Sequence, residues 1–283
     1  LVVQAYDSDG NLLSALSDTI KVNYTGSNAV PQGNLVINEI MYNPQIEDSE
    51  FIEIVNLSSN TFDLYNYRLD GVDMVFDESA VIQPGEHFVV VEDTPVFASA
   101  YGTAIRIGAK YDGSLDNGGE WLKLVDASGS LVDEVYYDDD APWPTNADGY
   151  GASLQLVDRM EDNNRVGNWA AATNGSLYTP GAANSATSNL PPFARLWLNE
   201  LQATNVTGLR DNFSERDPWI ELYSSDAATL NLTNYYLTDS YTDLAKWAFR
   251  TNAVVPTNSF LLVWADAQTN QTVYMTNHAS FRL

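Results

Sequence analysis

Carboxylates are the most abundant reactive groups in this sequence, and they gather in a few places. The chain carries 38 Asp and Glu residues against 13 Lys and Arg. Adjacent carboxylates repel one another, and a bound cation relieves that repulsion, so a run of acids suits Ca²⁺. The densest run is Asp138, Asp139 and Asp140, directly after a strand-like segment. This run predicts either a solvated acidic loop or a calcium site, and it is the first place to look for calcium.

A second group of oxygen-bearing side chains near the N-terminus has the spacing of a calcium loop. Its candidate ligands are Asp7, Asp9, Asn11 and Asp18. Leu12 stands where such a loop needs glycine for its tight turn, and strand-like segments flank the loop in place of helices. The competing interpretation is a hairpin turn in which Asp7 and Asn11 accept backbone hydrogen bonds and Gly10 takes a positive φ.

Paired glutamates recur in the chain and raise the question of catalysis. Glu39 and Glu53 sit in strand patterns that return around Glu200 and Glu221. Glycoside hydrolysis needs two carboxyl groups roughly 5–10 Å apart across a cleft. Acids at strand ends also serve structure by accepting backbone N–H bonds, and a pair of them can bridge a cation. Because the pattern is repeated, we favour the structural role.

Other catalytic constellations find little support. The chain has no Cys and only two His, and it contains no G-x-S-x-G, H-E-x-x-H, P-loop or dinucleotide fingerprint. His87 alternates with Phe88 and Val90, which predicts a solvent-facing strand histidine. We therefore expect a protein that is not an enzyme and assign no catalytic residues.

Two tryptophans in loops, Trp143 and Trp169, are candidates for ligand binding. Exposed aromatic rings stack on the apolar C–H faces of sugars, which is how carbohydrate-binding modules hold glycans. The alternative is that both indoles pack in the interior. Trp121, Trp197 and Trp219 lie in strand patterns, and we expect all three in the core.

Charge and composition exclude several classes of partner. The net charge of −25 opposes binding to phosphate backbones, so we expect no nucleic-acid partner. The sequence has no apolar run long enough for a transmembrane helix, and we expect no membrane insertion. The chain's 45% apolar residues are enough for sizeable cores. Abundant Asn, Ser, Thr, Gly and Asp suit an extracellular or cell-surface β protein.

Many short segments with period-two alternation predict an all-β fold of immunoglobulin-like sandwiches in tandem. One helix is expected at 94–101, with Thr94 as its N-cap and Pro95 in its first turn. The strands expected in the middle of the chain are Leu35–Met41, Glu50–Asn56, Phe62–Asp70, Met74–Phe76, His87–Glu92, Trp121–Asp126, Leu131–Tyr137 and Ser153–Leu156.

The chain divides into five segments. We expect the C-terminal hairpin of an immunoglobulin-like domain at 1–25, a linker at 26–34, a complete sandwich at 35–185, a second linker at 186–195 and an incomplete second sandwich at 196–283. The last segment repeats the first half of the complete one. Asn38 corresponds to Asn199, Glu53 to Glu221 and, further on, Phe88 to Phe260.

The order of motifs in 35–185 resembles a lamin-tail domain of the bacterial kind. The motifs are Leu35–Ile40, Glu50–Asn56, Phe62–Leu69, Val81–Val91, Asn117–Leu124, Val135–Tyr137, Trp143-Pro144, Gly151–Leu154 and Thr179–Gly181. Residues 196–283 resemble the first half of the same family. The resemblance implies an immunoglobulin-like sandwich with an interaction or spacer role in a large secreted or surface protein, and it transfers no catalytic residue.

We therefore expect a non-catalytic module for adhesion or spacing in a large bacterial protein. Protein partners or further copies would bind through sandwich surfaces or by strand addition, for which 19–24 could supply a strand in a fibre. One alternative is a carbohydrate-binding accessory module of a secreted hydrolase, with glycans as ligands. The third is an enzyme using paired carboxylates, whose cleft would need the long segments 94–120 and 138–151.

Overall fold

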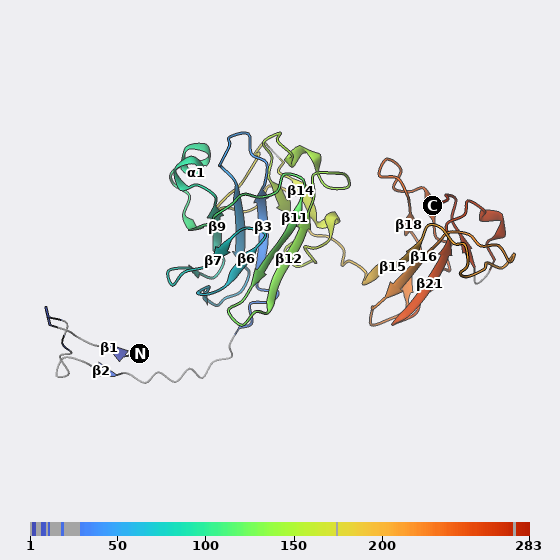
Figure 1. Ribbon diagram of the computed structural model, residues 1–283, viewed down its shortest axis with the longest axis horizontal. Helices are drawn as coiled ribbons and strands as arrows, with labels where there is room; N and C mark the ends of the chain where they lie inside the picture. The colour runs from blue at the N-terminus through green and yellow to red at the C-terminus, as the bar shows by residue number, and fades with distance from the viewer. Residues whose placement is uncertain are drawn as a thin grey trace.

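The computed structural model describes residues 2–3, 7–9, 11, 18–19, 29–173, 175–273 and 276–283. Strands β1 (Val2–Val3) and β2 (Asp18–Thr19) pair antiparallel. Most of the hairpin predicted at 1–25 lies outside the described residues, as does the strand predicted at 19–24 beyond Thr19. From residue 29 the chain forms two units that lie along its long axis (Figure 1).

The larger sheet of the first unit contains six strands in the order β10–β9–β4–β3–β13–β14. All neighbours are antiparallel except β10 and β9. A β-bulge interrupts the β3–β4 ladder between Ile37 and Glu39. In chain order the strands are β3 (Leu35–Met41), β4 (Phe51–Asn56), β9 (His87–Val91), β10 (Ile107–Lys110), β13 (Leu154–Leu156) and β14 (Trp169–Ala171).

A second sheet packs against the first and completes a sandwich. Its order is β12–β11–β6–β7. Strands β5 and β8, which precede and follow β6 and β7 along the chain, pair as a separate two-stranded sheet. Inward side chains of both sheets, among them Ile37, Leu69 and Leu122, form one buried cluster because strand residues alternate between faces. The bounds are β5 (Phe62–Asp63), β6 (Arg68–Asp70), β7 (Met74–Val75), β8 (Val81–Ile82), β11 (Glu120–Val125) and β12 (Leu131–Tyr137).

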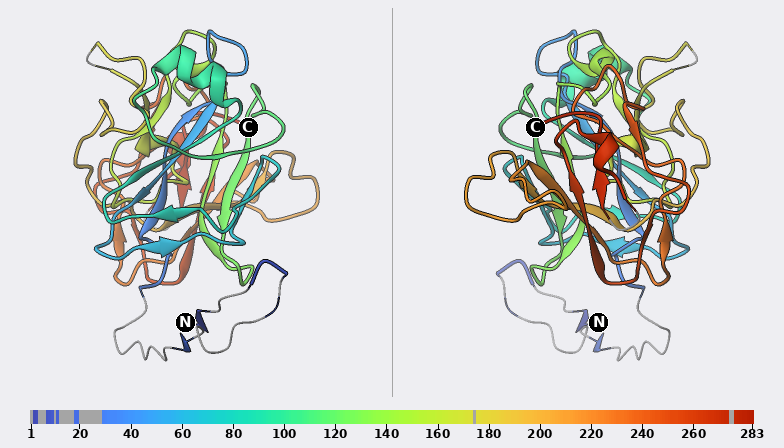
Figure 2. Two further views of the ribbon diagram at one scale, coloured as in Figure 1. Left: turned by 90° about the vertical axis from the view of Figure 1, so that its left-hand side faces the viewer. Right: turned by 90° about the vertical axis from the view of Figure 1, so that its right-hand side faces the viewer.

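Helix α1 (Thr94–Tyr101) covers the outer face of the larger sheet at one end of the first unit (Figure 2). Phe97 of α1 packs with Phe51 and Val89 in a separate small core, so β4 and β9 are buried on both faces. The helix has the predicted bounds, but its N-cap is Asp93 and not Thr94. The Asp93 carboxylate accepts a hydrogen bond from Val96 N at 2.9 Å.

The second unit repeats the strand pairing of the first half of the sandwich. Its main sheet has the order β15–β16–β21–β22, with the last pair parallel, and a bulge falls between Leu198 and Glu200. The pairs β17–β20 and β18–β19 correspond to β5–β8 and β6–β7. The bounds are β15 (Leu196–Gln202), β16 (Trp219–Ser224), β17 (Leu230–Asn231), β18 (Tyr236–Leu237), β19 (Trp247–Ala248), β20 (Val254–Val255), β21 (Ser259–Trp264) and β22 (Asn277–His278).

Three short 3₁₀ turns complete the described elements. They are Thr145–Ala147, Val166–Asn168 and Thr269–Gln271. The fold is thus mostly β with one short helix, as the sequence predicts. No helix among the described residues has the length and apolar character needed to cross a membrane.

Two sequence predictions need correction. The expected strand 62–70 is two strands, because Asn66 takes a positive φ of 62° and turns the chain between them. The correspondence of Phe88 with Phe260 is wrong by one residue. Glu53 pairs with Val89 and Glu221 with Leu262, so the counterpart of Phe88 is Leu261. A shift of one residue reverses the face, and Phe260 is accordingly exposed.

Candidate functional site

Glu39 is the centre of a buried polar network in the first unit. The bulge in β3 turns its carboxylate toward β13 and the segment after β14. Oε1 accepts hydrogen bonds from Ser153 Oγ at 2.5 Å, Gln155 Nε2 at 3.1 Å and Thr179 N at 2.7 Å. Oε2 accepts one from Thr179 Oγ1 at 2.9 Å. Both carboxylate oxygens therefore have partners although the residue is fully buried.

Glu53, on the neighbouring strand β4, holds the other half of this network. Its Oε1 lies 2.6 Å from Asn38 Nδ2 and 2.7 Å from His87 Nδ1, and its Oε2 accepts a bond from Gly181 N at 2.6 Å. Asn38 also bonds Asn184, which in turn donates to Leu156 O at 2.9 Å. His87 is therefore a partner of a buried acid and not the solvent-facing residue that strand alternation predicts.

The charges and hydrogen bonds of the network suit a structural role, in which it holds one segment of the chain against another. Burial raises the pKa of Glu39, and the nearby charge of Glu53 raises it further. Arg159 donates to Asn38 Oδ1 at 2.8 Å, and burial lowers the pKa of its guanidinium. The described contacts fasten the segment 179–184 over the Asn38–Glu39 step. Protein hydrogen-bond donors occupy the carboxylate oxygens of Glu39 and Glu53 and leave no place for a substrate, so the geometry favours the structural role over catalysis.

The corresponding residues of the second unit are open to solvent. Asn199 Nδ2 donates to Glu221 Oε1 at 2.7 Å, which repeats the Asn38–Glu53 bond. Glu200, the counterpart of Glu39, is exposed. In the first unit β3 lies between β4 and β13, whereas β15 pairs only with β16 among the described strands. The Asn–Glu pair is therefore covered in the first unit and exposed in the second.

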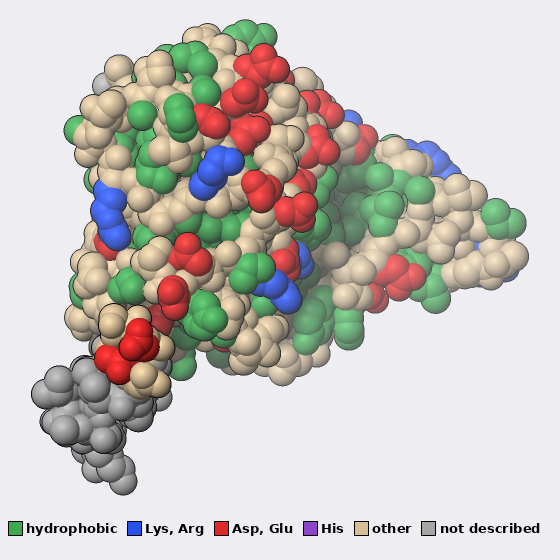
Figure 3. Space-filling view, turned by 60° about the vertical axis from the view of Figure 1, so that its left-hand side comes forward, with side chains coloured by type: hydrophobic (Ala, Val, Ile, Leu, Met, Phe, Trp, Pro, Cys, Tyr) green, Lys and Arg blue, Asp and Glu red, His purple; other side chains and the backbone are tan. Residues whose placement is uncertain are grey.

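The apolar side chains of β15 are exposed as well. Leu198 and Leu201 are 71% and 59% exposed, while their counterparts Ile37 and Ile40 are fully buried. Figure 3 shows hydrophobic side chains on the surface of the second unit beside the hollow where the units meet. Trp197 is also exposed, against the prediction that it is core, and the Arg165 guanidinium lies 3.9 Å from its ring centroid. We call the exposed strand 196–202 the open edge.

The predicted acidic run is brought together by the fold. One carboxylate oxygen from each of Asp138, Asp139 and Asp140 lies within 4.8 Å of the others. Asp140 N donates to Asp138 Oδ1 at 2.9 Å, so part of the cluster is a local turn. The pKa of Tyr42 is raised by its burial and by the charges of Asp148, Asp139 and Asp138. These three carboxylates therefore all lie near Tyr42, and calcium binding at the run remains a prediction.

The N-terminal group forms a turn among its described members. Asp7 Oδ1 accepts from Asp9 N at 3.0 Å and from Asn11 N at 2.8 Å, and these bonds lower the pKa of Asp7. Asp126 Oδ1 accepts from Ser128 N and Ser130 N in the same way. The Asp18 backbone lies in β2, and its side chain is outside the described structure. The calcium prediction for these residues stays a prediction.

The ligand-binding hypothesis for Trp143 and Trp169 does not fit the structure. Both indoles are buried, with ring centroids 6.2 Å apart, and Trp169 Nε1 donates to Asn163 O at 2.6 Å. A buried ring offers no face to a sugar, so these two residues belong to the core. Trp121, expected in the core, is exposed because it lies on the outer face of β11 beside Tyr136.

The structure also assembles a group that the sequence analysis missed. Asp211, Asp266 and His278 are buried together in the second unit. They come from three separate segments, and their spacing matches no metal or catalytic motif. The only signal available was that His278 is one of the chain's two histidines.

Comparison with protein families identifies the first unit. Residues 28–139 match the Lamin Tail Domain. The chain therefore contains one lamin tail domain, whose fold is immunoglobulin-like, in the region where the sequence motifs predict it. The sheets of this unit continue beyond the matched residues through β13 and β14. A search of curated proteins finds no match.

Proposed function

We propose that this chain is a non-catalytic interaction module of an extracellular or cell-surface protein, and that its open edge binds an extended segment of a partner polypeptide. In this proposal residues 196–283 are a second, partial lamin-tail-like unit. The observation that carries it is the contrast between β3 and β15. The two strands have the same bulge and the same Asn–Glu bond, but among the described strands β3 is paired on both sides and β15 on one side only.

An unpaired strand edge supports binding for two reasons. Its free backbone N–H and C=O groups form a template for strand addition, and native proteins usually protect such edges. The exposed Leu198 and Leu201 add apolar surface whose burial is favourable, at roughly 25 cal/mol per Å². Backbone bonds would supply affinity, and the side chains would supply specificity.

The chemistry of the partner strand follows from the covered copy. Strand β13 pairs with β3 so that Leu154 faces Ile40 and Gln155 faces Glu39. Gln155 is buried and donates to the Glu39 carboxylate at 3.1 Å. The segment that fits β15 therefore carries an amide or hydroxyl residue opposite Glu200 and an apolar residue opposite Leu201.

A peptide with the β13 sequence tests this proposal. A fluorescein-labelled peptide of residues 151–158 is titrated with the full chain, and binding is followed by anisotropy. We expect saturable binding, at least tenfold weaker for Leu201→Asp, because a carboxylate in the new interface would lose its hydration. The matched control is Val75→Asp, a substitution at an exposed strand position of the first unit, which should bind like wild type.

Two results would count against the open edge as a binding site. One is a wild-type chain that does not bind the peptide at millimolar concentration. The other is equal affinity of the wild-type chain and the Leu201→Asp variant, which would mean that the peptide binds elsewhere. A scrambled peptide with the same composition distinguishes strand recognition from general stickiness.

A non-catalytic role agrees with the described histidines. The described ring contacts of His87 and His278 are with Glu53, Asp266 and Asn212. No serine or threonine hydroxyl bonds either ring among the described residues, so the arrangement of a hydroxyl nucleophile and its base is not formed there. The acids Glu39 and Glu53 are occupied by donors.

Glycan binding is a second candidate function, and one observation favours it. Trp121 and Tyr136 are exposed cross-strand partners on β11 and β12, with ring centroids 5.5 Å apart. Two adjacent aromatic rings on a sheet can stack on a sugar chain. A glycan array probed with wild type and with Trp121→Ala tests this: a hit that the variant loses supports it, and an array without hits argues against it.

A further inference from the structure

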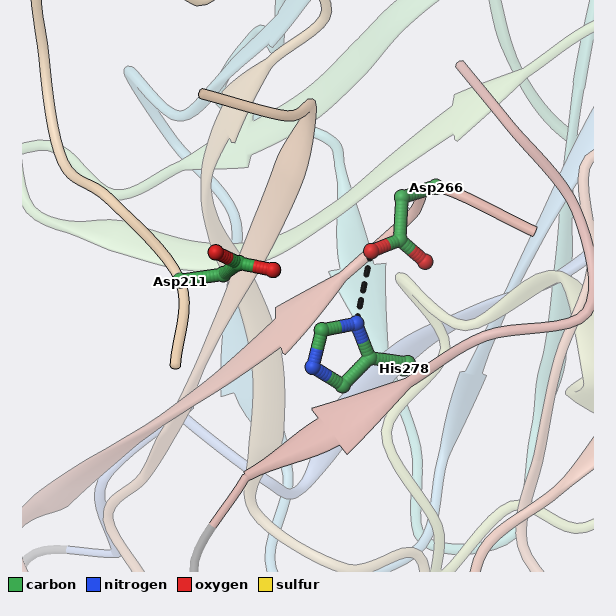
Figure 4. Close-up of side chains that lie close together, drawn as sticks. All are labelled: Asp211, Asp266 and His278. Atoms are coloured by element: carbon green, nitrogen blue, oxygen red, sulfur yellow. Dashed lines mark hydrogen bonds and ion pairs between the residues drawn. The ribbon is translucent and has the colours of Figure 1, made fainter. Parts of the chain in front are cut away.

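Three buried side chains with metal-binding donors meet inside the second unit. Asp211, Asp266 and His278 are 8%, 3% and 0% exposed. One donor atom from each lies within 4.8 Å of the other two. Figure 4 shows the Asp211 carboxylate turned toward the Asp266–His278 pair. At this separation of their donor atoms, the three side chains could bind one ion after small side-chain movements.

Distant segments hold these side chains in place. Asp211 begins a tight turn in which its Oδ1 accepts from Phe213 N at 2.9 Å and Glu215 N at 2.7 Å. Asp266 follows β21, and its Oδ1 accepts from Gln268 N at 2.9 Å. His278 lies on β22, which pairs with β21 next to it. The backbone therefore fixes one oxygen of each carboxylate and leaves the other directed inward.

The inward carboxylate oxygens are short of hydrogen-bond donors. Asp211 Oδ2 is buried and has no hydrogen-bond partner among the described residues, and the same holds for Asp217 Oδ2 nearby. Arg282 bonds Asp217 Oδ1 at 2.8 Å, so it compensates only that residue. A buried carboxylate oxygen without a donor is costly, and natural structures resolve this with a donor or a cation.

The imidazole of His278 shows the same deficit. Nδ1 lies 2.6 Å from Asp266 Oδ2, and Nε2 lies 2.8 Å from Asn212 Oδ1. The Asn212 amide nitrogen already donates to Gln271 O at 3.1 Å, which directs its oxygen at the ring. A neutral imidazole has one N–H, so it satisfies only one of its two oxygen neighbours. The other oxygen has no donor unless a second proton or a cation binds there.

We propose that Asp211, Asp266 and His278 bind a divalent transition-metal ion of the zinc class. Zinc takes carboxylate oxygen and imidazole nitrogen together, whereas calcium takes oxygen ligands alone. Metal binding needs an unprotonated imidazole nitrogen, and a neutral imidazole offers one. With the single N–H on Nε2, facing Asn212 Oδ1, the ion would bind on the Nδ1 side beside Asp266 and give Asp211 Oδ2 its missing partner.

The expected role of this ion is structural. It would join the turn at Asp211, the end of β21 and strand β22, which lie far apart in the sequence. Because an ion that binds only the folded state stabilises it, zinc should raise the melting temperature of the second unit. Asp266 follows β21 and His278 lies on β22, at the opposite end of the sheet order from β15, so zinc binding is tested separately from peptide binding at the open edge.

Metal-free full chain, prepared by dialysis against a chelator, tests the site. Zinc binding is measured by isothermal titration, and metal retained after gel filtration by mass spectrometry. We expect one zinc ion per chain and a rise in melting temperature of at least about 3 °C. Asp211→Asn should weaken zinc binding at least tenfold, while its amide oxygen can still accept the bonds of the turn.

Asp126→Asn is the matched control. Asp126 begins a turn with the same hydrogen bonds, loses the same charge on substitution, and has no histidine in its described contacts. It should bind zinc like wild type, as should His87→Gln. If His278→Gln fails to fold, Asp211→Asn and the wild-type titration still decide the matter.

Three outcomes would overturn the proposal. The first is a wild-type chain that retains no zinc, and the second is equal zinc affinity of Asp211→Asn and Asp126→Asn. The third is a chain that binds calcium but no zinc, and that loses calcium binding in Glu215→Gln but keeps it in His278→Gln. The last result would assign the ion to Asp211, Glu215 and Asp217, which also lie within 4.8 Å of one another.

Discussion

Asn199 donates to Glu221 across β15 and β16 at 2.7 Å, and this bond repeats the one from Asn38 to Glu53 at 2.6 Å. The first copy is buried beneath the segment 179–184, and the second is exposed. The bond therefore belongs to the strand pair and its bulge and does not depend on the cover. The cover adds Thr179 as a donor to Glu39 and Gly181 as a donor to Glu53.

Removing Glu39 should damage the first unit far more than removing Glu200 damages the second. Glu39→Ala removes the acceptor of four hydrogen bonds in the buried network. We expect a loss of about 3–5 kcal/mol in the free energy of unfolding, measured by urea denaturation. Glu200→Ala, at an exposed position, should stay within about 0.5 kcal/mol of wild type. Equal effects would show that the network around Glu39 contributes little.

Stability should be highest in mildly acidic solution. Burial raises the pKa of Glu50 from 4.5 to about 7 and that of Asp133 from 3.8 to about 7. A raised carboxyl pKa means that the folded state holds the proton longer, so stability falls as pH rises from about 4 to about 7. Hydrogen bonds lower the pKa of Asp77 and Asp126, so their stabilisation is lost as pH falls through and below 3.8.

Denaturation at pH 4.5 and pH 7.5 measures this dependence. Each carboxyl group with a raised pKa lowers the free energy of unfolding by at most about 1.4 kcal/mol per pH unit over this range. Asp133→Asn cannot titrate and should flatten the decline, because its amide oxygen can still accept from Ile37 N and Asn163 Nδ2. A wild-type chain that is more stable at pH 7.5 than at pH 4.5 would contradict the burial argument.

Calcium should bind weakly at the acidic run. We predict that millimolar CaCl₂ raises the melting temperature by roughly 2 °C and that Asp139→Asn removes the effect, because the cation relieves the repulsion among Asp138, Asp139 and Asp140. Glu78→Gln, at an exposed position outside this cluster, is the charge-matched control. No shift in the wild-type melting temperature would dismiss this site.

Much of the fold follows from local patterns. Period-two alternation in 131–137 predicts β12 with the bounds observed, because one face of that strand is buried. Strand β3 also has the predicted bounds, but it is buried along its whole length, and its signal is a short run of mostly apolar residues. The strands that were missed, β8, β10 and β14, have two to four residues and carry little periodic signal. Their pairing depends on long-range contacts that no local pattern records.

The sites were harder to predict than the strands. Glu39 and Glu53 are recognisable as a repeated pair, but only the fold shows that Ser153, Thr179 and Gly181 supply their partners. The burial of Trp143 and Trp169 depends on their packing against each other, and the spacing of the two residues does not reveal it. The parallel pairing of β21 and β22 brings His278 near Asp266, and Asp211 joins them from the segment between β15 and β16, which no sequence motif predicts.

Hydrogen exchange of the backbone amides in β15 and β3 tests the open edge most directly. Amides that are not bonded to a neighbouring strand exchange rapidly in solution, whereas amides within a sheet are protected. We predict that the outward amides of 196–202 exchange at least 100-fold faster than those of 35–41, and that the 151–158 peptide slows them. Equal protection of both strands in the free chain would show that β15 is not an open edge.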